Sequence, residues 1–245
     1  MTKTQKYKNI AIVLAGGSGS RMNSDVPKQY MKVWEKPILY YALKTFEESF
    51  IDEIILVTSE KEIQYCKTNI VDKYNFKKIS KIVAGGKERY NSVYNGLKAI
   101  SLDKNDQIMN NTNIFIHDGA RPCVTADILE RCLEAVKETS ACVAAVPVKD
   151  TIKIVDDNGY AVSTPDRNSL WQIQTPQVFS YEVILNAYEN LMHLVTINGI
   201  TDDAMVVEHY SNVKVKMVEG SYDNVKVTTQ GDIELVKCYI KRKTE

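Results

Sequence analysis

The strongest constraint on the fold is a regular alternation of short apolar runs with longer amphipathic segments over the first 148 residues. The runs are rich in Val and Ile, and several are apolar at successive positions, as strands covered on both faces are. Strands alternating with helices at this spacing form βαβ units, so we predict an α/β fold with a mainly parallel sheet. The expected strands are 10–14, 53–58, 79–83, 114–117 and 142–148, and the expected helices are 37–48, 60–73, 89–100 and 126–139.

The pattern changes after residue 148. Polar and apolar residues alternate over 149–155, a D-D-N-G turn signal follows at 156–159, and 160–163 can return as a second strand. We expect a β-hairpin arm at about 149–172 that protrudes from a single Rossmann-like domain of 245 residues flanked by helices. Further expected elements are an extended or turn segment at 174–177, helices at 181–192, 202–209 and 229–240, and strands at 213–218 and 224–227.

Charge and cysteine content exclude several classes of protein. Lys plus Arg and Asp plus Glu number 31 each, so we expect no general attraction to nucleic acid or to an anionic membrane. The five cysteines include no C-x-x-C pair, which favours reduced thiols. The apolar run 10–15 is too short for a signal sequence or a membrane span. We therefore expect a cytoplasmic protein.

A glycine-rich segment, A-G-G-S-G-S-R-M at 15–22, follows the first expected strand. Backbone without side chains at this edge of a sheet can approach a triphosphate closely, and Arg21 and Lys28 can bring positive charge to it. The Walker loop is excluded because no lysine follows the glycines in its register. The dinucleotide fingerprint is excluded because Met22 occupies its third glycine position. A plain strand-to-loop turn with incidental basic residues is the alternative interpretation.

Two further segments follow expected strands. The block G-G-K-E-R-Y-N-S at 85–92 precedes a helix and, taken alone, could be an ordinary helix start. Asp118 directly follows the strand expected at 114–117. A carboxylate at the ligand-binding edge of a sheet suits Mg²⁺, which proteins hold with one or two carboxylates plus substrate phosphates. An aspartate that caps the following loop is the alternative.

These segments resemble a known family. The pattern L-A-G-G-x-G-x-R-M at 14–22 with P-K-Q at 27–29 resembles the signature of sugar-phosphate nucleotidyltransferases, in the form of the cytidylyltransferase branch. Together with D-G-A-R-P at 118–122, the chain resembles the 2-C-methyl-D-erythritol 4-phosphate cytidylyltransferases of the non-mevalonate isoprenoid pathway. The other matching blocks, in the same order, are 85–92, 147–153, 166–177, 201–204 and 219–228.

The resemblance implies a role for each matching residue. CTP would be bound by Ala15, Gly16, Gly17, Gly86 and Ser92. The transition state at the α-phosphate would be stabilised by Arg21, Lys28 and Lys226. Asp118 would hold Mg²⁺. The small polyol phosphate would be held by Thr151, Arg167, Thr175 and Thr201. The resemblance also implies a homodimer in which the arm, with Thr151 and Arg167, completes the neighbouring site.

The identity of the acceptor has an alternative. Gly16 stands where this family often has alanine, and the same variant is familiar in ribitol-5-phosphate cytidylyltransferases, which share the fold and the reaction. The segments 166–168 and 222–224, with Trp171, favour methylerythritol phosphate. A catalytically silent nucleotide-binding protein on the same fold is a second alternative, although the candidate lysines, arginines and aspartate are all present.

Overall fold

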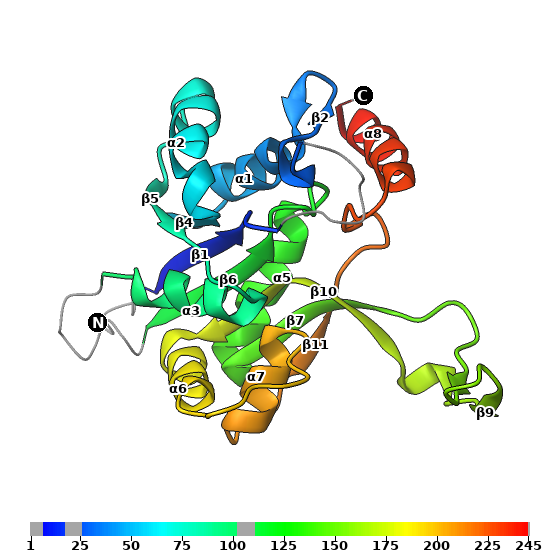
Figure 1. Cartoon of the computed structure of the whole chain (residues 1–245). Coiled ribbons are helices and arrows are strands. Elements are labelled where there is room, and N and C mark those ends of the chain that lie inside the picture. The colour runs from blue at the N-terminus through cyan, green and yellow to red at the C-terminus, as the bar shows by residue number, and fades with distance from the viewer. Residues whose placement is uncertain (1–6, 18–25, 102–110, 245) are drawn as a thin grey trace, which may run out of the picture.

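The computed structural model describes residues 7–17, 26–101 and 111–244, and in them a seven-stranded sheet is the central layer (Figure 1). The strand order is β11-β7-β10-β6-β1-β4-β5. Strand β10 is antiparallel to both of its neighbours, and the remaining neighbouring pairs are parallel, which confirms the predicted mainly parallel α/β sheet. The strands are β1 (Lys8–Leu14), β4 (Glu53–Thr58), β5 (Ile79–Ala84), β6 (Thr112–Asp118), β7 (Ala141–Pro147), β10 (Trp171–Ser180) and β11 (Lys216–Glu219).

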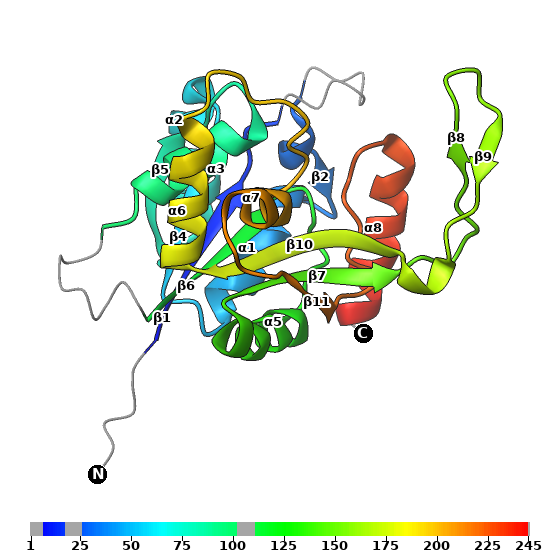
Figure 2. The same ribbon diagram turned by 90° about the horizontal axis from the view of Figure 1, so that it is seen from below.

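Helices cover both faces of this sheet (Figures 1 and 2). One apolar cluster joins the sheet to α1 (Ile38–Glu48), α2 (Ile63–Cys66) and α5 (Ala126–Thr139). The opposite cluster joins it to α3 (Arg89–Lys98), α6 (Tyr181–Met192) and α7 (Asp203–Tyr210). Successive residues of β1, such as Ile12 and Val13, belong to opposite clusters. Burial on both faces explains why the strands are continuous apolar runs in the sequence.

The C-terminal helix α8 (Gln230–Thr244) packs beside the main layers on a small hairpin, β2 (Lys32–Val33) with β3 (Lys36–Pro37). At its start, Asp232 Oδ2 accepts a hydrogen bond from the backbone N–H of Thr229 at 2.8 Å, as in a capping box. A third apolar cluster joins α8 to the hairpin and to Val227. The residue after Lys226 is thus anchored by α8.

The predicted hairpin arm protrudes from the sheet and consists of β8 (Ile154–Val155) and β9 (Ala161–Ser163) (Figure 2). Its regular strands are shorter than expected, since residues 149–153 form none. All residues from 149 to 164 are exposed. The arm therefore has no apolar core of its own within this chain.

The segment 174–177, expected to be extended or a turn, belongs to the extended strand β10, whose register with β7 shifts between Ile173 and Gln177. Two other expectations for secondary structure were wrong. The segment 224–227 forms no strand, because its backbone is held by loop contacts such as the bond from Val227 N to Ala120 O at 2.9 Å. The helix expected at 60–73 is divided into a 3₁₀ turn, α2 and a π-helical segment, and the spacing of apolar residues gives no sign of this.

Candidate active site

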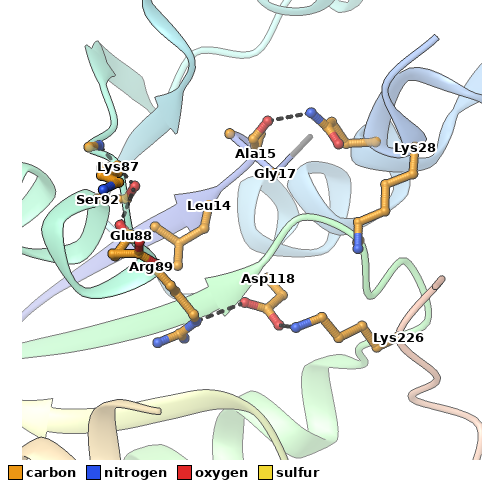
Figure 3. A pocket seen from close by; sticks show the side chains of 14 residues that line it. Leu14, Ala15, Gly17, Lys28, Lys87, Glu88, Arg89, Ser92, Asp118 and Lys226 are labelled. Carbon is orange, nitrogen blue, oxygen red and sulfur yellow. Dashed lines mark hydrogen bonds and ion pairs between the residues drawn. The ribbon is translucent and has the colours of Figure 1, made fainter. Parts of the chain in front are cut away.

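The expected nucleotide-binding residues line a cavity of about 370 Å³ at the carboxyl ends of β1 and β6, the edge where α/β sheets bind ligands (Figure 3). Arg21 lies outside the described residues, and its position stays a prediction. The structure brings together Ala15, Gly16, Gly17, Lys28, Gly86, Ser92, Asp118 and Lys226.

Ala15, in the described part of the glycine-rich segment (15–17), is tied to two neighbouring elements. The backbone N–H of Ala15 donates to Val57 O at 2.6 Å, which continues the pairing of β1 with β4. The carbonyl of Ala15 accepts a hydrogen bond of 2.6 Å from Nε2 of Gln29, whose side chain is buried. Gln29 lies in a short 3₁₀ helix beside Lys28. This bond ties Ala15 to the 3₁₀ helix that carries Lys28, and Lys28 lines the same cavity (Figure 3).

The glycines of the cavity differ in what they require. A Cβ on Gly16 would lie 3.4 Å from the backbone of Thr58 and Ser59, an ordinary contact. A Cβ on Gly86 would overlap the side chain of Asn91. The N–H of Gly86 also donates to Ser92 Oγ at 3.1 Å. The turn at Gly86 therefore needs glycine, whereas the backbone at Gly16 has room for alanine.

Asp118 lies at the centre of the site between two cations (Figure 3). Lys226 Nζ is 2.7 Å from its Oδ2, and Arg89 Nε is 3.5 Å from its Oδ1. Burial alone would raise the pKa of the Asp118 carboxyl, but the charges of Arg89, Lys226 and Arg121 outweigh it and hold that pKa well below its ordinary value. The side chain is therefore an ionised carboxylate at neutral pH.

A second cavity of about 270 Å³ adjoins the first and shares Arg89, Asp118 and Lys226 with it. Thr175 and Thr201, the expected acceptor-binding residues of the main body, line this second cavity. The two cavities therefore meet at a wall of charged side chains, as a site for two phosphate-bearing substrates requires.

Thr175 is held by two groups of β6. Its Oγ1 accepts a hydrogen bond from the backbone N–H of Asp118 at 3.1 Å and lies 3.0 Å from Nδ1 of His117. Burial lowers the pKa of His117 to about 4, so its imidazole is neutral at physiological pH. The neutral ring acts on Thr175 by hydrogen bonding and adds no charge to the site.

Arg89 and Gln29 are residues of this site whose roles the sequence did not reveal. Arg89 lines both cavities and pairs with Asp203 as well as Asp118. The sequence feature that could have indicated its role is its position as the first helical residue after the Gly85-Gly86 turn. Gln29 stands in the P-K-Q block, and only the fold shows what its amide contacts.

Thr151 and Arg167 contribute to neither cavity in this chain. Both are exposed on the arm, and Nη1 of Arg167 donates to Lys149 O at 3.0 Å. The arm also exposes apolar side chains, including Tyr160 at 74% and Val162 at 66%. Figure 2 shows the hairpin extending away from the sheet.

The possible metal ligands among the described residues suit an ion that is held partly by the protein and partly by substrate. No group of three or more His, Cys, Asp and Glu side chains that could hold a metal is found in the described residues. Asp118 is a single ionised carboxylate beside the glycine-rich segment. This set fits Mg²⁺ completed by phosphate oxygens and water, and does not form a cage made of protein ligands alone.

Comparison with known proteins identifies the family. The model of the family "IspD: 2-C-methyl-D-erythritol 4-phosphate cytidylyltransferase" matches residues 9–242. The chain belongs to this family. The 2-C-methyl-D-erythritol 4-phosphate cytidylyltransferase of Lachnospira eligens is 53% identical to it over 95% of this chain and 99% of the relative. That of Clostridium botulinum strain 657 is 46% identical over 97% of this chain and 99% of the relative.

Solved structures of the IspD family share the fold. The crystal structure of 4-diphosphocytidyl-2C-methyl-D-erythritol synthase from Anaerococcus prevotii matches with a TM-score of 0.80 and 34% identity, covering 96% of this chain and 97% of that one. The Francisella tularensis enzyme matches with a TM-score of 0.78 and 30% identity, covering 95% and 99%. These matches confirm the family and the fold class that the motifs indicated. In the described residues, no helix is long and apolar enough to cross a membrane.

Proposed function

We propose that this chain transfers the cytidylyl group of CTP to 2-C-methyl-D-erythritol 4-phosphate, in the non-mevalonate pathway of isoprenoid biosynthesis. The observation that carries the proposal is the pair of adjoining cavities whose common wall is Asp118, Arg89 and Lys226, in a chain of the IspD family. A phosphate oxygen of the acceptor attacks the α-phosphorus of CTP, and the bond from that phosphorus to the bridging oxygen breaks. The products are 4-diphosphocytidyl-2-C-methyl-D-erythritol and pyrophosphate.

The first cavity is suited to the nucleotide. Ala15, Gly16 and Gly17 bring bare backbone to the carboxyl end of β1, where N–H groups can meet phosphate oxygens. At the other side of the cavity, the tight turn at Gly86 and the hydroxyl of Ser92 offer small groups to the base and ribose. Backbone and small polar groups leave room for a pyrimidine and little for a larger base.

Catalysis is mainly positional and electrostatic. The attacking phosphate is already an anion, so no general base is needed. Lys28 and Lys226 both line the cavity (Figure 3), and Arg21 is proposed to join them. Fixed cations that stabilise charge on the α-phosphate in the transition state are the main contribution expected of a protein in phosphoryl chemistry.

Asp118 is the proposed protein ligand of Mg²⁺. Its ionised carboxylate lies where both cavities meet, so the remaining ligands can come from triphosphate oxygens and water. When bound, Mg²⁺ neutralises charge on the phosphate oxygens. Lys226, paired with Asp118 at 2.7 Å, would then be able to turn toward the substrates.

The acceptor is proposed to lie in the second cavity against Thr175 and Thr201. Thr151 and Arg167 are proposed to reach the same position from a second copy of the chain, because they lie on an exposed arm outside both cavities. The exposed apolar side chains of the arm support a homodimer, since they would be covered by the partner. We place the reaction in the cytoplasm, with no nucleic acid or membrane partner.

An assay of pyrophosphate release with Mg-CTP tests the proposal. Methylerythritol phosphate and ribitol 5-phosphate are supplied in parallel at equal concentration, and the nucleotide product is identified by mass. We expect faster turnover with methylerythritol phosphate. Faster formation of CDP-ribitol would overturn the choice of acceptor, and no pyrophosphate release with either acceptor would overturn the enzymatic function itself.

A further inference from the structure

Asp203, the first residue of α7, is a carboxylate whose side chain has no solvent exposure. Its two oxygens accept hydrogen bonds from Nη1 and Nη2 of Arg89, at 2.8 and 2.7 Å. The hydroxyl of Tyr188 donates to Oδ1 at 2.6 Å. A bidentate pair of arginine and carboxylate fixes the orientation of the guanidinium as well as its charge. Asp203 therefore determines where Arg89 points.

The position of Asp203 is itself tied to the central sheet. Oε1 of Gln177, a buried side chain of β10, accepts from the backbone N–H of Asp203 at 3.0 Å and from that of Ala204 at 2.8 Å. Nε2 of Gln177 donates to Asp202 at 2.9 Å. Asp203 is thus a rigid anchor, held from β10 and facing the first residue of α3.

Both Nη atoms of Arg89 pair with Asp203, so only its Nε is close to Asp118. Nε of Arg89 is 3.5 Å from Oδ1 of Asp118, while Lys226 is 2.7 Å from Oδ2. An arginine without another partner would turn its fork to Asp118 and form two parallel hydrogen bonds. Oδ1 of Asp118, which now has only a contact of 3.5 Å, would then accept a short hydrogen bond, and the carboxylate would be less available to a metal ion. Asp203 and Asp118 compete for one guanidinium.

We propose that Asp203 is a positioning residue that holds Arg89 away from bidentate pairing with Asp118 and so keeps the Asp118 carboxylate available to a divalent cation. The inference rests on the proposed function in one respect, the assignment of the cation to Asp118. The inference extends that function because it explains why the buried carboxylate of Asp203 shares Arg89 with the carboxylate of Asp118 in a site for anionic substrates. Asp203 touches neither cavity, and it acts through Arg89.

Binding of Mn²⁺, a spectroscopically visible stand-in for Mg²⁺, measures this role directly. Free Mn²⁺ is followed by electron paramagnetic resonance with the protein in excess over CTP, so that little unbound nucleotide competes for the ion, and without acceptor, in the wild type and in Asp203→Asn. Asparagine keeps the shape and removes the charge that holds Arg89. We expect the Mn²⁺ affinity to fall by about 10- to 100-fold, as for other residues that orient metal ligands.

A double variant separates positioning from a structural role. Adding Arg89→Gln to Asp203→Asn removes the cation that would otherwise cover Asp118. We expect the Mn²⁺ affinity to return to within about threefold of the wild type, since the two sites are coupled. Equal or greater weakening in the double variant would overturn the proposal, because a structural role of Asp203 predicts added damage.

Two more variants complete the test. Glu53→Gln breaks the ion pair of 2.7 Å with Lys8 at the other end of β4, and we expect lower thermal stability with unchanged Mn²⁺ affinity. Tyr188→Phe removes one hydrogen bond to Asp203 and should weaken Mn²⁺ binding by about two- to threefold. Should Asp203→Asn fail to fold, an unchanged affinity in Tyr188→Phe overturns the proposal.

The outcomes distinguish this inference from the proposed function. A wild-type chain that binds CTP but no Mn²⁺ would overturn both the metal assignment and the role of Asp203. Unchanged Mn²⁺ affinity in a folded Asp203→Asn variant would overturn the role of Asp203 alone.

Discussion

The cavity region and the hairpin arm contribute to the proposed site in opposite ways. The cavity residues lie at the ends of strands that are buried on both faces, and neighbouring side chains hold them by short hydrogen bonds such as that from Gln29 to Ala15. The arm exposes every residue from 149 to 164 and has no core of its own. The sheet orients its residues within one chain, whereas Thr151 and Arg167 lie exposed on the arm, and we propose that a second copy of the chain completes their site.

In the proposed reaction, one substrate is therefore bound by a single chain and the other by two assembled chains. In the proposed function, CTP is bound by contacts inside one chain. Binding of the acceptor is proposed to depend in addition on assembly, because two of its proposed contacts lie on the arm. Variants of the two regions should therefore fail in different ways.

Replacement of Lys28 by alanine should have the largest effect. The loss of a cation at the cavity should lower kcat by about 10²- to 10³-fold, as for the loss of one oxyanion-hole donor. Steady-state kinetics with Mg-CTP and methylerythritol phosphate measures it. Lys32→Ala, an exposed lysine of β2, is the matched control and should retain activity. Near-normal turnover by Lys28→Ala would refute its catalytic role.

Mixing two inactive variants tests the role of the arm. Arg167→Ala should have low activity with an unchanged melting temperature, because the side chain is exposed and lies outside the cavities. When Lys28→Ala and Arg167→Ala are mixed and allowed to exchange subunits, half of the dimers contain one intact site. About a quarter of the wild-type activity should return. No recovery in a mixture shown to contain heterodimers would place Arg167 in its own chain's site.

Removal of the hydrogen bond from Gln29 to Ala15 should lower stability and CTP binding by an intermediate amount, with an effect confined to the cavity region. Gln29→Ala leaves the carbonyl of Ala15 with only the longer hydrogen bond of 3.5 Å from Thr58 Oγ1, which costs about 1–3 kcal/mol of unfolding free energy. The KM for CTP should rise while dimerisation is unchanged. Urea unfolding and steady-state kinetics measure the two effects. Gln64→Ala, an exposed glutamine, is the control, and equal loss in both variants would contradict the prediction.

Removal of the Asp232 carboxylate at the start of α8 should lower the free energy of unfolding by a smaller amount that depends on pH. Burial would raise the pKa of Asp232, but hydrogen bonds from Thr228 and Thr229 outweigh it and lower that pKa. A carboxyl whose pKa is lower in the folded state stabilises above its unfolded pKa, and this contribution disappears as pH falls through the folded value. Asp232→Asn should therefore cost about 1 kcal/mol at pH 7 and nothing in strong acid.

Unfolding by urea at several pH values measures this difference. Asp127→Asn, in the first turn of α5, is the matched control. A cost for Asp232→Asn that stays constant down to strong acid would contradict the assignment of the effect to the Asp232 carboxylate.

Gly16→Ala should have the smallest effect. A Cβ at Gly16 makes only ordinary contacts, so the variant should keep its KM for CTP and gain about 0.4–1 kcal/mol of stability from a less flexible unfolded chain. Gly86→Ala, where a Cβ would overlap Asn91, is the contrasting variant and should weaken CTP binding. A large loss in Gly16→Ala would show that glycine is needed at the cavity for a reason other than space.

The sequence predicted much of the fold because most strands carry their own signal. The runs at 10–14 and 53–58 are apolar at successive positions, and both faces of those strands are in fact buried. The middle of β10 was not recognised as strand because its residues 174–177 are polar or proline and satisfy their hydrogen bonds with loops and helix ends. Local patterning cannot show such long-range partners.

The candidate site was predictable to a similar extent. The family resemblance implied that Lys28, Asp118 and Lys226 act together, and the fold brings them to one cavity. The role of Arg89 was hidden, since it depends on Asp203, which is 114 residues away in the sequence. A contact of that kind is set by the packing of α3 against α6 and by the position of α7 beside them.

The antiparallel strand β10 also affects how the sheet is completed as the chain is synthesised. Strands β6 and β7 do not pair with each other, and the strand between them is made only after the whole arm. Until residue 180 has left the ribosome, both strands present unpaired backbone edges that could pair with another chain. The arm therefore lengthens the interval in which the edges of β6 and β7 that face β10 are unpaired, and β11 covers the other edge of β7 later still.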